Sequence, residues 1–286
     1  MIDLHTHTDK SDGTSTPPEL VRAAAEAGID TLGISDHDTF AGYDEAVPLA
    51  REAGIELVCG IELSTRLPAH SGSRGKSVHM LGYFLESEPT AGFRAWLETN
   101  QRSRRERNRR LIARLNSLGI EITLGEVEAL GRTLAGRPHF ARILVEKGYV
   151  ANRQEAFDRY IGEEGRAYVY RDEPSVEEGI RRIRDAGGLP SLAHPIRIGA
   201  KAEAMLPQFV DAGLLAIEAY HSDHRPEHVQ HYLALARHYG LLVTGGTDFH
   251  GDNKPGVLLG SVDLPQPFWE KLRGSTNLAR RSAGND

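Results

Sequence analysis

Short apolar runs alternate with amphipathic segments near both ends of the chain. In the first ninety residues, four runs predict strands, at 2–5, 31–35, 55–60 and 78–84. Two segments between them predict helices, at 17–27 and 43–53. The alternation returns later, with helices predicted over 174–186, 202–212 and 226–239 and strands over 189–193, 214–219 and 241–244. Repeated strand–helix–strand units favour an α/β fold, which we interpret as a distorted (βα)7 barrel, with an open doubly wound sheet as the alternative.

The middle of the chain interrupts this alternation. Residues 93–118 predict one long, highly charged helix, and shorter helices are predicted over 124–130, 138–147 and 154–162 with no strand among them. We therefore expect a discontinuous barrel, formed by 1–97 and 171–273, that carries a small helical insertion domain over 98–170. The end of the chain, 274–286, is polar and predicts a mobile tail.

The composition is that of an ordinary globular protein and excludes several classes. Hydrophobic residues make up 40% of the 286 residues, and the net charge of −6 differs from that of a strongly cationic nucleic-acid binder. The single cysteine, Cys59, excludes an intrachain disulfide and a cysteine-rich metal site. No apolar run approaches the roughly 20 residues of a membrane helix. The N-terminal residues lack the apolar core of a secretory signal, so we expect a cytoplasmic protein without membrane association.

Histidines and carboxylates are concentrated where the predicted strands end. They are His5 and His7, Asp12 in the next loop, Asp36 and His37, Glu62, His79 within the fourth strand, His194, and Asp248 and His250. Because the C-terminal ends of barrel strands meet on one face, these side chains are expected to converge. Imidazole nitrogens and carboxylate oxygens suit zinc, manganese or iron. A single histidine is usually structural, but this joint pattern predicts a site for several metal ions.

Five short motifs resemble those of the PHP (polymerase and histidinol phosphatase) family. They are D-L-H-T-H-T at 3–8, S-D-H-D at 35–38, G-I-E at 60–62, A-H-P at 193–195 and T-D-F-H at 247–250. The resemblance covers about 1–90 and 171–260. It implies a distorted (βα)7 barrel with a trinuclear metal centre that hydrolyses phosphoesters.

The resemblance also implies a ligand set for each metal. It assigns the first metal to His5, His7, Glu62 and Asp248, the second to Glu62, His79 and His194, and the third to Asp12, His37 and His250. Asp12 stands where several family members carry histidine. An aspartate there favours a harder ion such as Mn²⁺, with Zn²⁺ or Fe²⁺ as the alternatives.

Two further motifs are similar to a PHP subfamily that acts on nucleotides and short RNA. They are G-R-P-H-F-A-R at 136–142 and E-A-Y-H-S at 218–222. The similarity implies removal of the 3′-phosphate from nucleoside 3′,5′-bisphosphates, such as adenosine 3′,5′-bisphosphate, by a metal-bridging hydroxide. The alternatives are a 5′→3′ exonuclease on short RNA or DNA oligonucleotides and a histidinol phosphate phosphatase. A non-catalytic partner of a polymerase is disfavoured by the complete ligand set, and we expect no obligate protein partner.

Other residues have candidate roles in catalysis and substrate binding. Asp248 is a candidate to orient or deprotonate the attacking water, and His194 or His221 to protonate the leaving oxygen. Arg137 is the first candidate for a second phosphate, because a guanidinium group matches phosphate with two parallel hydrogen bonds. Further candidates for substrate binding are His139, Arg197, His221, His224 and Lys254.

An arginine run lies on the long helix predicted in the insertion. It comprises Arg102, Arg104, Arg105, Arg107, Arg109, Arg110 and Arg114. Seven arginines in thirteen residues cannot all point the same way on a helix. The ordinary interpretation is a solvated helix face with some arginines paired to acids. The functional one is an electrostatic funnel for a polyanionic substrate or a track for RNA.

Overall fold

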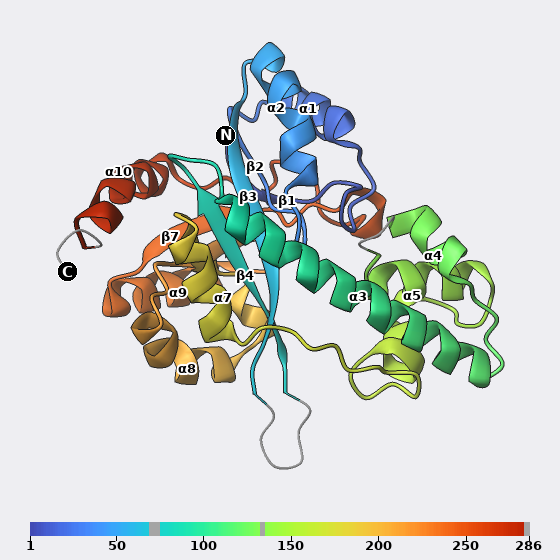
Figure 1. Cartoon of the computed structure of the whole chain (residues 1–286). Coiled ribbons are helices and arrows are strands. Elements are labelled where there is room, and N and C mark those ends of the chain that lie inside the picture. Colours follow the sequence, from blue (N-terminus) through green and yellow to red (C-terminus); the bar gives the residue numbers. More distant parts are fainter. Residues whose placement is uncertain (69–74, 132–134, 283–286) are drawn as a thin grey trace.

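Seven strands form one sheet that curls into a nearly closed barrel (Figure 1). The structure is a computed structural model that describes residues 1–68, 75–131 and 135–282. The strands follow chain order and are β1 Ile2–Thr6, β2 Thr31–Ile34, β3 Glu56–Arg66, β4 Ser77–Phe84, β5 Leu189–Leu192, β6 Ala216–His221 and β7 Leu242–Gly246. The predicted distorted barrel is confirmed.

The segment after β7 returns to β1 and brings the two edges of the sheet together. Thr6 and Phe249 form a parallel bridge. The carboxylate of Asp3 accepts hydrogen bonds from the backbone N–H and the hydroxyl of Thr247, at 2.9 and 2.7 Å. Asp3 is fully buried, and these bonds satisfy its oxygens. The chain segments that carry His5 and Asp248 are therefore neighbours.

Two pairings in the sheet are antiparallel, β3 with β4 and β4 with β5, whereas the others are parallel. The strand predicted to end at residue 60 continues to Arg66 and forms a long hairpin with β4. Glu62 consequently lies within β3, and its expected place at a strand end is wrong. A buried carboxylate usually interrupts a strand pattern, but here histidine side chains surround the carboxylate, so the strand continues through it.

Helices cover the outside of the barrel. They are α1 Pro17–Glu26, α2 Ala41–Ala53, α7 Val176–Asp185, α8 Ala200–Asp211, α9 Pro226–Tyr239 and α10 Gln266–Ser282, with short helices η3 Pro195–Arg197 and η4 Gly251–Asn253. Thr16 begins α1 with a reciprocal capping box to Glu19, as expected for this Thr-Pro-Pro start. The helix α10 extends into the segment that was expected to be a tail from residue 274. Within the described residues, no helix is both long and apolar enough to cross a bilayer.

The predicted insertion is helical throughout its described elements. These are α3 Ala91–Ser117, α4 Leu124–Gly131, α5 Arg137–Glu146, α6 Arg153–Ala156 and the π-helical turn η2 Phe157–Ile161. The first turns of α3 place Phe93 and Leu97 in the barrel core, whereas Leu111 and Leu115 belong to a separate apolar cluster with Phe140 of α5. One long helix thus leads from the barrel into the insertion (Figure 1). This second core supports our proposed division of the chain.

Candidate metal centre

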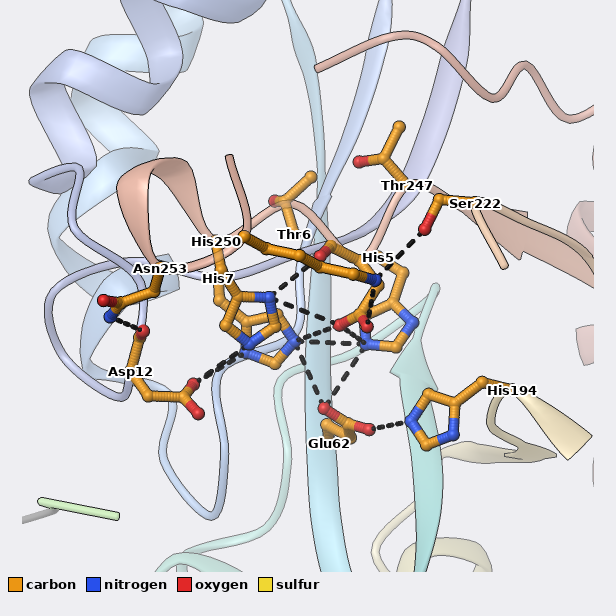
Figure 2. Close-up of polar contacts among 12 residues, drawn as sticks. His5, Thr6, His7, Asp12, Glu62, His194, Ser222, Thr247, His250 and Asn253 are labelled. Carbon is orange, nitrogen blue, oxygen red and sulfur yellow. Dashed lines mark hydrogen bonds and ion pairs between the residues drawn. The ribbon is translucent and has the colours of Figure 1, made fainter. Parts of the chain in front are cut away.

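The structure brings all nine candidate metal ligands to one end of the barrel. His5 lies in β1, Glu62 in β3 and His79 in β4, and the others follow strand ends: His7, Asp12, His37, His194, Asp248 and His250. Figure 2 shows His5 and His7 meeting at Glu62, with His194 on the other side of this carboxylate and Asp12 beside His250. Glu62 is therefore the central carboxylate of the group.

Four ligand atoms surround one point with the spacing that a metal ion requires. His5 Nε2 and His7 Nε2 are 3.1 Å apart. Glu62 Oε2 lies 3.4 and 3.2 Å from these nitrogens, and Asp248 Oδ1 lies 3.4 and 3.3 Å from them. Ligands about 2.1 Å from a tetrahedral ion are about 3.4 Å from one another. Asp248 Oδ1 is buried without a hydrogen-bond partner among the described residues, so this set fits a bound cation.

The other oxygen of Glu62 faces a second pair of histidines. Glu62 Oε1 lies 2.8 Å from His79 Nδ1 and 2.7 Å from His194 Nε2. His37 Nδ1 approaches Glu62 Oε2 to 3.2 Å and is buried without a hydrogen-bond partner in the described ranges. A carboxylate with one oxygen toward each set can bridge two ions.

Asp12, His37 and His250 form a third group, as the family resemblance implies. Asp12 Oδ1 lies 3.2 Å from His250 Nε2, and Asp12 Oδ2 lies 3.6 Å from His37 Nε2. Asn253 donates a hydrogen bond of 2.7 Å to the backbone oxygen of Asp12 (Figure 2). These residues come from three different loops, so the third group depends on how the loops pack.

Electrostatics at the centre favour negative carboxylates and cations between them. Burial alone would raise the pKa of Glu62, but His37, His79 and His5 lower it well below its usual value. Burial would lower the pKa of His7, but Asp248 and Glu62 raise it to about 10. Without a metal ion, His5 and His7, whose pKa values are both raised, therefore hold protons that a metal ion would displace.

Two buried carboxylates outside the nine candidate ligands support the site, Glu218 at the ligands themselves and Asp36, which the strand-end pattern had included, at the loop after β1. Glu218 of β6 accepts a hydrogen bond from His5 Nδ1 at 2.8 Å and from the backbone N–H of His194 at 2.6 Å. Asp36 accepts hydrogen bonds from Thr8 and Ser11 at 2.5–2.8 Å. The bond to Glu218 leaves Nε2 of His5 free for a metal. Both carboxylates lie inside motifs already quoted, E-A-Y-H-S and S-D-H-D, which was the available signal.

The second oxygen of Asp248 faces two cations. Asp248 Oδ2 accepts hydrogen bonds from Arg197 Nη2 at 2.7 Å and from Lys254 Nζ at 3.1 Å. His221 also approaches this carboxylate, with its Nε2 3.4 Å from Asp248 Oδ2. Its Nδ1 accepts a hydrogen bond of 2.9 Å from the backbone N–H of Asp223. These contacts engage Oδ2 and leave Oδ1 toward His5 and His7. Burial would raise the pKa of Asp248, but His250 and His5 lower it well below its usual value.

A cavity of about 490 Å³ separates the metal ligands from the insertion. One wall carries ligands such as Glu62 and His194, together with Arg197 and Lys254. Five arginines line the rest of the cavity, three from the insertion, one from the segment that returns from it and one from β3. We call them the arginine wall: Arg104, Arg107, Arg137, Arg171 and Arg66.

Three members of the arginine wall have acidic partners. Arg66 Nε lies 2.8 Å from Glu173, and Arg171 lies 3.2 Å from Glu173 and 3.4 Å from Asp38. Arg104 forms an ion pair with Asp38. Arg66 also lies 3.1 Å from Glu163, so the five arginines of the wall share three acids.

Arg107 and Arg137 are the members of the wall without such partners. Arg107 is 6% exposed and makes no hydrogen bond or ion pair with any described residue, and its Nε is buried. Arg137 lies over the ring of Phe157. Burial lowers the pKa of Arg107 well below its usual value, and repulsion from Arg137 and Arg104 lowers it further. Two guanidinium groups without an ion pair among the described residues are thus available to an anion in the cavity.

Three candidate binding residues do not line this cavity. They are His221, which is buried beside Asp248, and two residues that lie farther from the centre, His139 and His224. His139 is buried in α5, where its Nδ1 accepts the backbone N–H of Gly136 at 2.9 Å. His224 lies 2.8 Å from the backbone oxygen of Ala219 and packs against Tyr232. Neither residue lines the cavity.

The arginine run of α3 divides among several surroundings. Arg105 pairs with Glu128, and Arg109 pairs with Glu106. The remaining exposed members hydrogen-bond to neutral oxygens: Arg102 to Thr99, Arg110 to the carbonyl of Tyr170 and Arg114 to the carbonyl of Arg166. Only the buried face of α3, with Arg104 and Arg107, reaches the cavity.

Comparison with known proteins agrees with the motifs and the site. Residues 3–156 match the PHP domain. The chain is 33% identical over 277 residues to the 5′-3′ exoribonuclease of Haemophilus influenzae, covering 94% of this chain and 98% of that protein. It is 31% identical over 284 residues to the 3′,5′-nucleoside bisphosphate phosphatase of Chromobacterium violaceum, covering 95% and 96%.

A solved structure has the same fold. A protein from Bifidobacterium adolescentis, described as a metal-dependent phosphoesterase, superposes with a TM-score of 0.81 at 32% identity and covers 94% of each chain. Similarity of this extent includes the barrel and the insertion. The chain therefore belongs to the PHP domain family and is a metal-dependent phosphoesterase.

Proposed function

We propose that this chain removes the 3′-phosphate from nucleoside 3′,5′-bisphosphates, so that adenosine 3′,5′-bisphosphate yields AMP and phosphate. The observation that carries this proposal is the unpaired charge of Arg107 and Arg137 across the cavity from the metal ligands. A substrate with two phosphates would place one at each wall. The relative from Chromobacterium violaceum, named for this substrate class, supports the same activity.

The cavity suits a nucleoside between the two phosphates. Its volume of about 490 Å³ lies within the range of about 300–1,000 Å³ for small-molecule sites. Pro138, Phe157 and Ile198 line it between the charged walls. These apolar side chains would contact a base or a ribose, while the arginines bind the 5′-phosphate.

The chain's own residues would prepare the 3′-phosphate for hydrolysis. Divalent ions, which we propose to be Mn²⁺, would neutralise the phosphate dianion and lower the pKa of a water molecule. Arg197 and Lys254 lie beside Asp248 and would bind non-bridging phosphate oxygens. Asp248 would orient the water, because its low pKa keeps the carboxylate negative and its Oδ1 has no hydrogen-bond partner among the described residues. His194 lines the cavity, but burial lowers its pKa to about 3 and it is a proposed metal ligand, so it would not supply the proton for the leaving oxygen.

The second candidate is a 5′→3′ exonuclease on short oligonucleotides. The same arginines would bind the terminal 5′-phosphate of an RNA, and the Haemophilus influenzae relative bears that name. Histidinol phosphate is disfavoured, because its amine would lie among unpaired guanidinium groups.

The test compares three substrates with Mn²⁺-loaded enzyme: adenosine 3′,5′-bisphosphate, adenosine 3′-phosphate and a short 5′-phosphorylated RNA. We expect fast phosphate release from the bisphosphate, slow release from the 3′-phosphate and little mononucleotide from the RNA. A higher kcat/KM on the RNA would replace the proposal with the exonuclease. Equal rates on the two small substrates would remove the role of the arginine wall.

A variant locates the 5′-phosphate. Arg137→Gln should lower kcat/KM for the bisphosphate by about 10- to 100-fold, the range for a lost hydrogen bond to a charged group. It should leave turnover of adenosine 3′-phosphate nearly unchanged. Arg105→Gln is the matched control, because Arg105 pairs with Glu128 away from the cavity. Equal losses on both substrates would contradict the assignment of Arg137.

A further inference from the structure

Asp38 lies between the metal ligands and the arginine wall. It follows His37 directly in the chain, is fully buried, and has a positive φ of 55°. Few residues other than glycine adopt this backbone conformation, although Asp and Asn tolerate it best. Such strain persists where the surrounding contacts over-determine it.

Three separate parts of the chain donate hydrogen bonds to Asp38. Ser64 of β3 donates its backbone N–H to Oδ1 at 2.8 Å. Arg104 of α3 pairs with Oδ2, and Arg171 approaches the same oxygen to 3.4 Å. Gln101, also on α3, donates to the backbone oxygen of Asp38 at 2.9 Å.

These donors come from both connections between the barrel and the insertion. The helix α3 leads into the insertion and carries Arg104 and Gln101, whereas Arg171 lies on the segment that returns from it. Arg104 also donates to Ser64 Oγ at 2.9 Å, so its guanidinium group is held against β3. Asp38 therefore contacts the path of the chain on both sides of the insertion.

The unpaired Arg107 lies about one turn beyond Arg104 on the same helix and on its buried face. A contact that fixes Arg104 therefore also fixes where Arg107 meets the cavity. The helix has many arginines but few apolar anchors between Leu97 and Leu111, so packing alone defines its position weakly in this stretch. In this stretch, Gln101 and Arg104 hold the helix to Asp38 through polar contacts.

We propose that Asp38 is a positioning residue that sets the distance between the 5′-phosphate site on the arginine wall and the metal ligands. This inference rests on the proposed function, since the distance matters only for a substrate that carries two phosphates. Asp38 itself does not touch the substrate. It acts through Arg104 and Arg171, and through the placement of α3.

The experiment uses the Asp38→Asn variant of the full chain, loaded with Mn²⁺. Asparagine retains the acceptor for Ser64 and tolerates the backbone conformation, but it loses the charge that holds Arg104 and Arg171. The matched control is Glu128→Gln, which removes an acidic partner of Arg105 on the same helix, outside the cavity. KM and kcat are measured with adenosine 3′,5′-bisphosphate and with adenosine 3′-phosphate, and bound metal is counted.

We expect KM for the bisphosphate to rise about tenfold or more in Asp38→Asn, with kcat within about threefold. Turnover of adenosine 3′-phosphate and the metal content should match the parent, and the control should match it throughout. An equal loss on both substrates, or a loss of bound metal, would overturn the inference, since Asp38 would then support the metal centre or the fold. An unchanged KM would overturn it as well.

Conservative rescue separates positioning from simple charge balance. Asp38→Glu keeps the charge but moves the carboxylate outward by one methylene group, so it should fail to restore the KM. Full rescue by Glu would show that only charge matters and would contradict positioning. If the parent enzyme shows no preference for the bisphosphate, the proposed function fails instead, independently of these variants.

Discussion

Replacing Arg107 with methionine should increase the thermal stability of the ligand-free protein and lower its affinity for a nucleotide. Arg107 is 6% exposed, has no acidic partner among the described residues, and is repelled by Arg137 and Arg104. Methionine has similar length, favours helices and fills irregular space. The variant thus removes an uncompensated buried charge at little steric cost.

The size of the effect follows from the cost of that charge. Replacing buried charged groups with apolar ones stabilises proteins by about 1–4 kcal/mol in favourable cases. Arg107 borders a cavity, so water solvates part of the guanidinium group and the lower half of that range applies, about 1–2 kcal/mol. In a chain of this size, 1 kcal/mol corresponds to about 2 °C in Tm. We expect an increase of about 2–4 °C in phosphate-free buffer.

The assay is thermal unfolding with and without AMP, a product whose 5′-phosphate would occupy the arginine wall. In the parent, AMP at about 100 times its Kd should add about 2.7 kcal/mol of stability. In Arg107→Met this gain should largely disappear. Arg105→Met is the control and should change both quantities little, because Arg105 is a partly exposed residue paired with Glu128. Destabilisation by Arg107→Met with an unchanged AMP response would refute the reasoning and make Arg107 structural.

Three further predictions concern the metal centre and the field of the cavity. Glu218→Gln should weaken metal binding or activity by about 10- to 100-fold, because glutamine has one acceptor oxygen and no charge, whereas the carboxylate accepts from both His5 and the backbone N–H of His194; a metal titration measures this, and an unchanged affinity would contradict it. In chelator-treated protein, Tm should fall as pH rises from 6.5 to about 10. Because the pKa of His7 is raised to about 10 in the folded protein, protonated His7 stabilises the fold fully below pH 6.5. This stabilisation is lost as the pH rises to about 10, whereas the Tm of metal-loaded protein should not show this fall. Finally, kcat/KM for the bisphosphate should fall as salt increases, since the arginine wall attracts the substrate; a flat salt profile would argue against that attraction.

Most candidate metal ligands could be proposed from the sequence because they lie in or next to a short apolar run; Asp12, in a polar loop, was assigned through the family resemblance. A strand end recognised from its pattern places His194 or Asp248 at one face, whatever the details of packing. Glu62 shows the limit of this logic. Its strand continues beyond it because histidines from other strands compensate the buried carboxylate, and that compensation is a tertiary effect.

The arginine wall could not be predicted in the same way. Arg107 stands in a run of similar residues, and its separation from Arg105 or Arg109 depends on which face of α3 meets the barrel. Asp38 and Arg171, which lie at that face, are distant in the chain. Conversely, Arg137 was recognised within its motif, whereas His139 of the same motif has a local role at the start of α5.

The two candidate activities use the same groups, which is why sequence motifs do not separate them. In a 3′,5′-bisphosphate and at the first bond of a 5′-phosphorylated RNA, the leaving atom is the same ribose 3′-oxygen, and the 5′-phosphate sits on the same ribose. The substrates differ only beyond the reacting phosphorus, where the RNA continues into a second nucleotide. In the proposed function, the arginine wall would bind the part that they share. Discrimination between the two substrates therefore depends on the side of the cavity beside Asp248, which Arg197, Lys254 and Asn253 border.

If these side chains leave no space for a second nucleotide, the enzyme is a monoesterase. Arg197→Ala should then raise RNA cleavage relative to bisphosphate turnover, whereas a parallel loss of both would show that Arg197 acts on the reacting phosphate alone.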